Sequence, residues 1–230
     1  MSIRKIAAQA ALLLSIFLAG TVVIWMWVMP HFGLQMSDWN DPSKTAKFLI
    51  DHKSVFTFYF FFDWVFGITT FVLAAAFTQR FSRRQPWLGI VIGGWGVISA
   101  ALFLAAGTIG ILGTQAAVHD YVLHANLAYA MTAQQLQFGI ESCAVAAAGV
   151  LTFCAALASS RTKAFGKTVN FFGYLTGIFY VAALPLSAMN SQGGYLSLVG
   201  VLAAIVFNIG VAASFMKQPH TELTLAPQAS

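Results

Sequence analysis

Charge is scarce in this chain. Only 8% of its 230 residues are Asp, Glu, Lys or Arg, whereas 59% are hydrophobic. A soluble domain carries about 25% charged residues, so these few charges cannot cover a water-facing surface. The shortage excludes an ordinary soluble domain and predicts an integral membrane protein.

Cysteines and catalytic motifs are scarce as well. The two cysteines, Cys143 and Cys154, fall in one predicted helix. A rise of about 1.5 Å per residue holds them too far apart for a disulfide bond. The sequence contains no Ser-His-Asp pattern, phosphate-binding loop or Cys-x-x-Cys, and no histidine lies at the centre of an apolar run, as an axial haem ligand would. No catalytic residue and no cofactor are therefore predicted.

Six apolar runs divide the chain, each close to or above the roughly 20 residues that a helix needs to cross a bilayer. We therefore expect an all-α fold, a single bundle of six transmembrane helices within residues 1–217. The polar residues 218–230 are expected to form a disordered cytoplasmic tail. The predicted spans cover residues 6–29, 55–78, 87–113, 131–158, 169–188 and 195–216.

The basic residues fall mostly between alternate spans. Lys and Arg concentrate on the cytoplasmic side of membrane proteins, so both termini are predicted to be cytoplasmic. Charges in these short groups mark topology and do not indicate a nucleic-acid partner. One side of the predicted bundle holds Arg4, Lys5, Arg80, Arg83, Arg84, Arg161, Lys163, Lys167 and Lys217, and the other holds Lys44, Lys47 and Lys53.

The longest connection, residues 30–54, contains a pattern typical of a helix start. Asp41 stands where an N-cap is expected, and Pro42 follows at the first helical position. The pattern predicts an amphipathic helix over residues 42–53, lying on the outer membrane surface. A solvated loop is the alternative for this segment.

Small residues recur at a spacing that lets two helices approach closely, at Gly89 and Gly93 and again at Gly173 and Gly177. The first pair follows a span that contains Asp63. The second pair follows a span that contains Glu141. The two predicted hairpins can therefore be interpreted as parallel copies of one unit, as in some transporters. A chance recurrence of small residues is the alternative.

Several stretches carry a family resemblance: "FFFDWVFGITTFVLAAAF", "QRFSRRQPWLG", "QFGIESCAVAAAGVL" and "FGYLTGIFYVAALPL". Their order resembles that of a family of uncharacterised six-span bacterial membrane proteins, a domain of unknown function. The resemblance covers about residues 4–216. It implies a six-helix fold in a bacterial inner membrane and carries over no activity, substrate or catalytic residue.

Asp63 and Glu141 are the two acids within the predicted spans, where a charged carboxylate is costly. If both face the interior, they could share a proton and serve a proton relay or a cation site. Gln137 and Asn208 would add polar groups to such a path, together with Thr69, Thr70, Gln134 and Gln135. The alternative is a structural role, with each acid protonated and hydrogen-bonded to a neighbouring helix.

Four histidines fall on the predicted outer side, two of them in residues 114–126, which are expected to connect two spans as a loop. Asp120 and His124 are spaced to meet on one helical face. Convergence of three histidines would suit copper or zinc, but none lies in a compact ligand motif, so no metal site is predicted. The candidates are His31, His52, His119 and His124.

The first functional hypothesis is a protein without catalytic apparatus. It would be an accessory or structural subunit of a membrane complex, or a bundle that binds lipid or another hydrophobic ligand, with room for a quinone or pigment. The alternatives are a small proton- or cation-coupled transporter that uses Asp63 and Glu141, and a membrane enzyme with a periplasmic histidine metal site. Expected partners are membrane lipids and other membrane subunits or further copies of this chain.

Overall fold

The protein is described by a computed structural model that covers residues 3–35, 38, 41–189 and 192–217. These residues form helices joined by short turns, without a strand in the described part. The helices are α1 Ile3–Val23, the π-helix η1 Ile24–Val28, α2 Met29–His31, α3 Pro42–Asp51, α4 Lys53–Phe81, α5 Pro86–His124, α6 Ala128–Thr162, α7 Lys167–Met189 and α8 Gln192–Lys217. The predicted tail, residues 218–230, lies outside the described residues.

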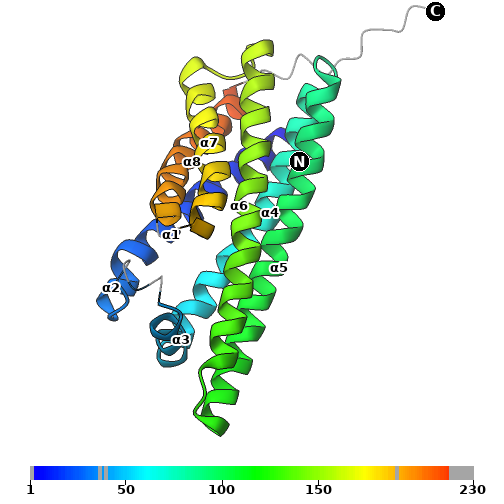
Figure 1. The fold of residues 1–230 in the computed structure, drawn as a ribbon. Coiled ribbons are helices and arrows are strands. Elements are labelled where there is room, and N and C mark those ends of the chain that lie inside the picture. The colour runs from blue at the N-terminus through cyan, green and yellow to red at the C-terminus, as the bar shows by residue number, and fades with distance from the viewer. Residues whose placement is uncertain (1–2, 36–37, 39–40, 190–191, 218–230) are drawn as a thin grey trace, which may run out of the picture.

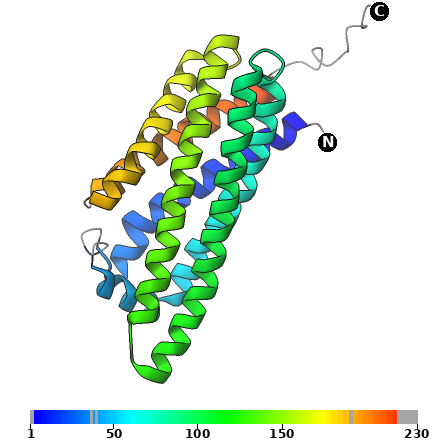
Figure 2. The ribbon, with the colours of Figure 1, turned by 45° about the vertical axis from the view of Figure 1, so that its right-hand side comes forward.

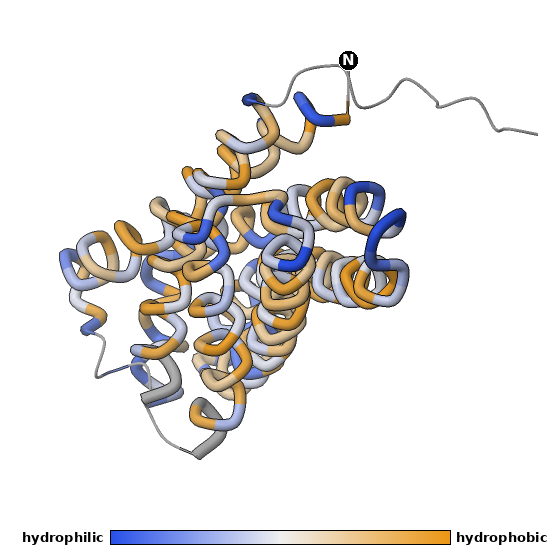
Figure 3. The backbone as a smooth tube through the Cα atoms, turned by 90° about the horizontal axis from the view of Figure 1, so that it is seen from above, coloured by the Kyte–Doolittle hydropathy of each residue, from blue (hydrophilic) through white to orange (hydrophobic). Residues whose placement is uncertain are grey.

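Six helices in the described residues are long and apolar enough to cross a membrane: Ile3–His31, Lys53–Phe81, Pro86–His124, Ala128–Thr162, Lys167–Leu186 and Tyr195–Lys217. Their surfaces agree with that environment. Each carries large apolar side chains that point away from the bundle, such as Ile16, Phe71, Ile90, Leu136, Ile178 and Ile209. Figure 3 shows the same pattern from above, with hydrophilic residues gathered at turns and helix ends. These features confirm the prediction of an all-helical bundle with six apolar spans.

The six long helices form a closed ring. Each packs against the next in the order α1, α4, α5, α6, α7 and α8, and α8 returns to pack against α1. Contacts across the ring are sparse, and the closest is between α4 and α6. A ring with little packing across its middle leaves interior space, which becomes important for the candidate site.

The two ends of the ring differ in charge and in length (Figures 1 and 2). At one end lie the start of α1, the α4–α5 and α6–α7 turns and the end of α8. Those segments contain the basic residues from Arg80 to Arg84, from Arg161 to Lys167 and at Lys217. We name this end of the ring the arginine-rich end. At the opposite end, which we name the hairpin end, α5 and α6 extend beyond the other helices and join at residues 125–127.

The extension of α5 and α6 corrects the predicted loop over residues 114–126. At about 1.5 Å per residue, the 39-residue α5 is about 58 Å long, well beyond the roughly 30 Å of a bilayer core. The prediction ended this helix at membrane length. Residues 114–124 contain no Gly or Pro, so the helix continues to Ala125, whose φ of 51° ends α5. Lys163 ends α6 in the same left-handed conformation. His119 and His124 therefore lie on a helix and not in a loop.

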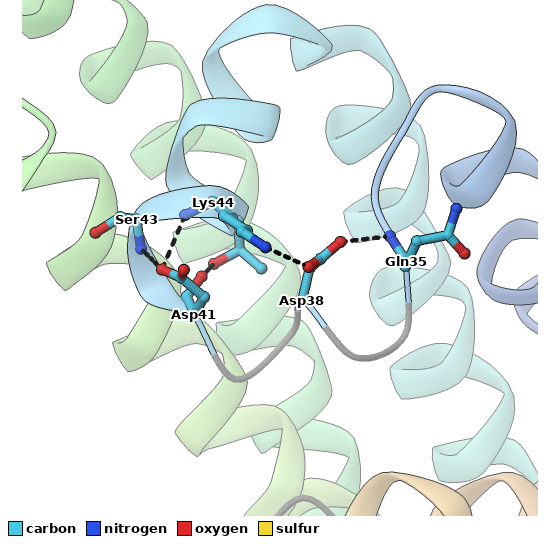
Figure 4. Close-up of polar contacts among 6 residues, drawn as sticks. Gln35, Asp38, Asp41, Ser43 and Lys44 are labelled. Atoms are coloured by element: carbon cyan, nitrogen blue, oxygen red, sulfur yellow. Dashed lines mark hydrogen bonds and ion pairs between the residues drawn. The ribbon is translucent and has the colours of Figure 1, made fainter.

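The helix predicted within residues 42–53 is confirmed as α3, Pro42–Asp51. The Asp41 side chain accepts hydrogen bonds from the backbone N–H groups of Ser43 and Lys44, as an N-cap does (Figure 4). Lys44 also forms an ion pair with Asp38, N···O 2.7 Å. The hydrogen bond from Lys44 lowers the pKa of the Asp38 carboxyl. This small polar cluster fixes the start of α3, which packs against α4, α5 and α6 near the hairpin end.

The four predicted packing glycines all lie against the preceding helix. A Cβ atom at Gly89 would collide with Ser82 Oγ at the C-cap of α4, and one at Gly93 would approach Thr78 Oγ1 to 3.0 Å. Gly173 and Gly177 meet Ala156 and Phe153 of α6 in the same way. The glycine positions are thus alike in the α4–α5 and α6–α7 hairpins, although α5 is 39 residues long and α7 only 23. Cys143 and Cys154 are free thiols, as expected.

Candidate functional site

A network of four polar side chains joins α4 and α6 inside the ring. The Gln137 amide Nε2 donates to Asp63 Oδ2 at 3.2 Å and to Glu141 Oε2 at 2.9 Å. The Tyr59 hydroxyl donates to Glu141 Oε1 at 2.7 Å. We name these four residues the carboxyl network. The two acids predicted from the sequence are thus brought together, and they share one amide group.

The sequence positions these side chains through the helix repeat. Tyr59 and Asp63 are four residues apart on α4, and Gln137 and Glu141 are four apart on α6, so each pair shares one helix face. Close approach of α5 covers Asp63 from the side. A Cβ atom at Gly107 would lie 3.0 Å from the Asp63 Cβ, so only glycine leaves room there.

Three of the four network residues are buried, Glu141 is partly buried, and no described basic side chain pairs with either acid. Asp63 and Tyr59 are 1% exposed, and Gln137 is 0% exposed. The ion pairs among the described residues involve other acids, Asp38 and Asp120, and none involves Asp63 or Glu141. All donors to the two carboxyls are neutral groups. Two carboxyls that share a neutral donor in such surroundings cannot both carry a charge without repulsion, which favours a single proton held between them.

A cavity of about 70 Å³ lies inside the ring, between this network and the arginine-rich end. Glu141 lines the cavity, whereas Asp63 lies behind it. Helices α1, α4, α6, α7 and α8 contribute most of the wall, with Phe103 from α5. The wall is largely apolar, including Leu14, Leu18, Phe66, Leu73, Val145, Leu151, Val201 and Ala204.

The hydroxyl groups in the wall do not make the cavity polar. Thr21, Thr152 and Thr176 each donate to the backbone carbonyl one turn earlier, at 2.8 to 3.1 Å. Because these hydroxyls bond to their own helices, the methyl groups are the parts of the side chains that meet neighbouring atoms. Asn208 differs: it is 5% exposed, lines the cavity and makes no hydrogen bond to another described residue. The cavity is therefore an apolar space with a carboxyl at one end and an amide near the other.

The cavity is elongated along the ring. On α6 it extends from Glu141 to Thr152, and on α1 from Leu14 to Trp25, about 16 Å in each case by helix rise. Glu141 marks the end nearer the hairpin. The part of α6 from Glu141 to Thr162 is about 32 Å long by helix rise, and the whole of α7 has a similar length. Glu141 thus lies at the level where α7 ends, at the outer limit of the shortest spans.

Aromatic side chains fill the ring beyond the other end of the cavity. Phe77 and Phe207 line the cavity and pack against one another, with ring centroids 6.4 Å apart. Phe81, Phe165 and Phe215 pack behind them. The Arg80 guanidinium lies 5.1 Å from the ring centroids of both Phe165 and Phe215 and donates to the Ala164 carbonyl at 3.1 Å. We name these five phenylalanines and Arg80 the aromatic plug.

The π-helix η1 lies beside the carboxyl network. It contains Trp25, which lines the cavity and packs 6.1 Å from the Tyr59 ring. A π-helical segment adds a residue to a helical turn and is found frequently at functional sites. Here it places an indole ring at the carboxyl end of the cavity, while Trp27 points outward and is 75% exposed.

The remaining predicted polar residues are distributed unevenly. Thr70 lines the cavity, whereas Thr69 turns to the Val65 carbonyl of its own helix. Gln134 is buried above the network, and Gln135 is exposed on the outside of α6. The predicted polar path therefore reduces to Gln137, Glu141 and Asn208, with Asp63 behind.

The histidines do not form a metal site in the described part of the chain, which contains no group of three or more His, Cys, Asp or Glu side chains that could hold an ion. His124 Nδ1 pairs with Asp120 at 2.9 Å, as their spacing predicted. His52 packs 5.0 Å from the Phe32 ring, and His31 packs 5.5 Å from the same ring.

Two functional residues were not found from the sequence. Tyr59 precedes Asp63 by four residues, the same spacing as Gln137 and Glu141, so the repeated pattern was a usable signal. Trp25 stands near the end of an apolar run, where aromatic residues commonly mark a membrane interface, and its inward orientation depends on the π-helix, which leaves no plain mark in the sequence. No family model, curated protein or solved structure matches this chain.

Proposed function

We propose that this protein binds an elongated hydrophobic or amphipathic molecule inside its ring of membrane-spanning helices. The observation that carries the proposal is the apolar cavity that ends at the Glu141 carboxyl. Binding sites for small molecules are mostly apolar and contain a few placed polar groups that fix the ligand's orientation. Glu141 and the groups bonded to it supply that polar end, and the long apolar wall supplies the rest.

The proposal includes a setting for the site. The protein is a multi-pass protein of a bacterial inner membrane, with the arginine-rich end and both termini in the cytoplasm. The excess of Lys and Arg at that end supports this orientation. Membrane lipids cover the exposed apolar side chains, and the extended hairpin of α5 and α6 lies on the outer side. Glu141 then lies near the outer surface, within reach of molecules from the outer leaflet.

The test fills the cavity with a larger side chain and identifies which molecules remain bound to the protein. Ala148 lines the cavity, and an Ala148→Phe substitution adds a ring to it. Cys143 lies one turn away on the same helix but is exposed, so Cys143→Phe is a matched control. Each variant is extracted with its surrounding lipid, and native mass spectrometry identifies the bound molecules.

We expect wild type and Cys143→Phe to retain a defined molecule in constant ratio, and Ala148→Phe to lose it. If all three carry the same molecules in the same amounts, the proposed cavity site is wrong.

A second candidate function is proton- or cation-coupled transport. The specific observation that favours it is the pair of carboxyls that share the Gln137 amide. The aromatic plug opposes it, because a transport path would have to open through closely packed rings and Arg80. Flux into reconstituted vesicles, compared among wild type, Asp63→Asn and Glu141→Gln, decides between the two. Equal flux in all three eliminates transport through these acids.

A further inference from the structure

We infer that the molecule bound in this cavity is an amphipathic cation, with an ammonium-type head between Glu141 and Trp25 and its apolar tail toward Asn208. The inference rests on the proposed function and specifies the ligand class. It excludes a neutral or anionic head as the preferred ligand. Three independent observations support it: the charge balance of the carboxyl network, the aromatic ring beside it and the shape of the wall.

The charge balance of the network is incomplete. With one proton shared, Asp63 and Glu141 carry one negative charge between them, and the hydrogen bonds from Tyr59 and Gln137 come from neutral groups. Neither acid forms an ion pair with another described residue. A charge buried without an opposite partner is costly. A cationic head that enters the cavity supplies the missing charge, whereas an anionic head adds repulsion.

Glu141 is the acid that a ligand can reach. It lines the cavity, while Asp63 is 1% exposed and does not. Two neutral donors hold the Glu141 carboxyl from the protein side, the Tyr59 hydroxyl on Oε1 and the Gln137 amide on Oε2. These bonds fix its orientation and leave further acceptor capacity on both oxygens.

Trp25 adds an aromatic face at the same end. Its side chain lines the cavity and packs against Tyr59, the donor to Glu141. Cations bind favourably over an indole ring, and this interaction strengthens away from water. An acid and a tryptophan next to an apolar channel favour an alkylammonium group. A carboxylate or phosphate head would instead require basic side chains, and the residues lining the cavity include no Lys or Arg.

The wall suits an apolar tail, but a cavity of about 70 Å³ is smaller than a decyl chain, so the surrounding helices must move apart for such a tail to enter. The residues that line it span about 16 Å along the ring, and three of its four threonine hydroxyls, those of Thr21, Thr152 and Thr176, are bonded to their own helices. Asn208 lies near the far end and is 5% exposed. The tail therefore points from Glu141 toward the aromatic plug, and the head lies at the level where α7 ends.

The test measures binding of decyltrimethylammonium to the purified full-length protein in phosphatidylcholine nanodiscs, with decan-1-ol as the neutral probe and empty nanodiscs as the background. Wild type is compared with Glu141→Gln and Trp25→Leu. Two controls make the same kind of change outside the cavity: Asp120→Asn, an acid to its amide on α5, and Trp27→Leu on the outer face of the π-helix.

We expect saturable binding of the cation to wild type and to both controls. Loss of a charge-assisted contact should weaken it about tenfold or more in Glu141→Gln. Loss of the indole should weaken it about 2- to 30-fold in Trp25→Leu. Because Trp25→Leu keeps all four residues of the carboxyl network, it tests the inference even if Glu141→Gln does not fold.

Other results overturn the inference in distinguishable ways. If decan-1-ol binds saturably while the cation does not, or if the cation binds equally to wild type, Glu141→Gln and Trp25→Leu, the ligand class is wrong and the cavity site remains. If neither probe binds saturably but Ala148→Phe still loses the co-purified molecule, the ligand class is likewise wrong. If neither probe binds and Ala148→Phe matches Cys143→Phe, the proposed function fails as well.

Discussion

Gln137 offers the sharpest test of the carboxyl network, because one amide nitrogen serves both acids. The proposed change is Gln137→Leu, which nearly preserves volume and removes both hydrogen bonds. A hydrogen bond to a charged group contributes about 1.5–3 kcal/mol, and a buried acceptor left without a donor adds a desolvation cost. The change also removes the Gln137 Oε1 atom, which is buried without a partner, so part of the loss is offset.

The expected net loss is about 3 kcal/mol in the free energy of unfolding. Tyr59→Phe removes a single bond to Glu141 and should lower that free energy by about half as much. Gln135 provides the matched control, since it lies on the same helix but is exposed. Gln135→Leu should change stability by no more than about 0.5 kcal/mol.

The assay is equilibrium unfolding of each purified variant in mixed micelles, followed by circular dichroism. The ordering is as informative as the sizes: Gln137→Leu should be least stable, Tyr59→Phe intermediate, and Gln135→Leu close to wild type. If Gln137→Leu unfolds at the same denaturant concentration as Gln135→Leu, the shared amide contributes nothing to stability, and the network described here does not hold α4 against α6.

Three further predictions concern other parts of the ring. Asn208→Leu should raise stability by about 1 kcal/mol, because it removes from an apolar wall an amide that makes no hydrogen bond to another described residue, and a fall in thermal unfolding temperature would contradict that view. Arg80→Lys should lower stability by about 1–2 kcal/mol, because a lysine cannot lie flat on two rings and keep its bond to the Ala164 carbonyl; Arg83→Lys, on an exposed residue, is the control. Lys44→Met should raise the pKa of Asp38 toward its usual value of 3.8. Since folding lowers that pKa, the stabilisation from the pair is present above pH 3.8 and is lost as the pH falls below it. NMR titration of the Asp38 carboxyl measures its pKa in the wild type and in Lys44→Met. An unaltered pKa would show that Lys44 does not cause the lowering.

The sequence was sufficient for the helices and for the two acids. Long apolar runs have few alternatives in a chain with so little charge, and Asp41 and Pro42 are strong helix-start residues, so α3 was found with its cap. The rarity of acids in such runs also singled out Asp63 and Glu141.

Neither the helix lengths nor the cavity could be predicted from the sequence in this way. The residues beyond Thr114 continue α5 because no Gly or Pro interrupts the backbone hydrogen bonds, and membrane thickness does not limit helix length. The cavity depends on how five helices pack around a centre that none of them fills. That is a property of side-chain shape across distant segments, and no local pattern records it.

A hollow ring also responds to hydrostatic pressure. Unfolding or filling a void reduces the volume of the system, in proportion to the void that disappears. The cavity of about 70 Å³ corresponds to roughly 40 mL/mol, so each kilobar should favour states without the void by about 1 kcal/mol. Compression should therefore drive apolar molecules into the ring, and a protein already occupied by its ligand should withstand pressure better than an empty one.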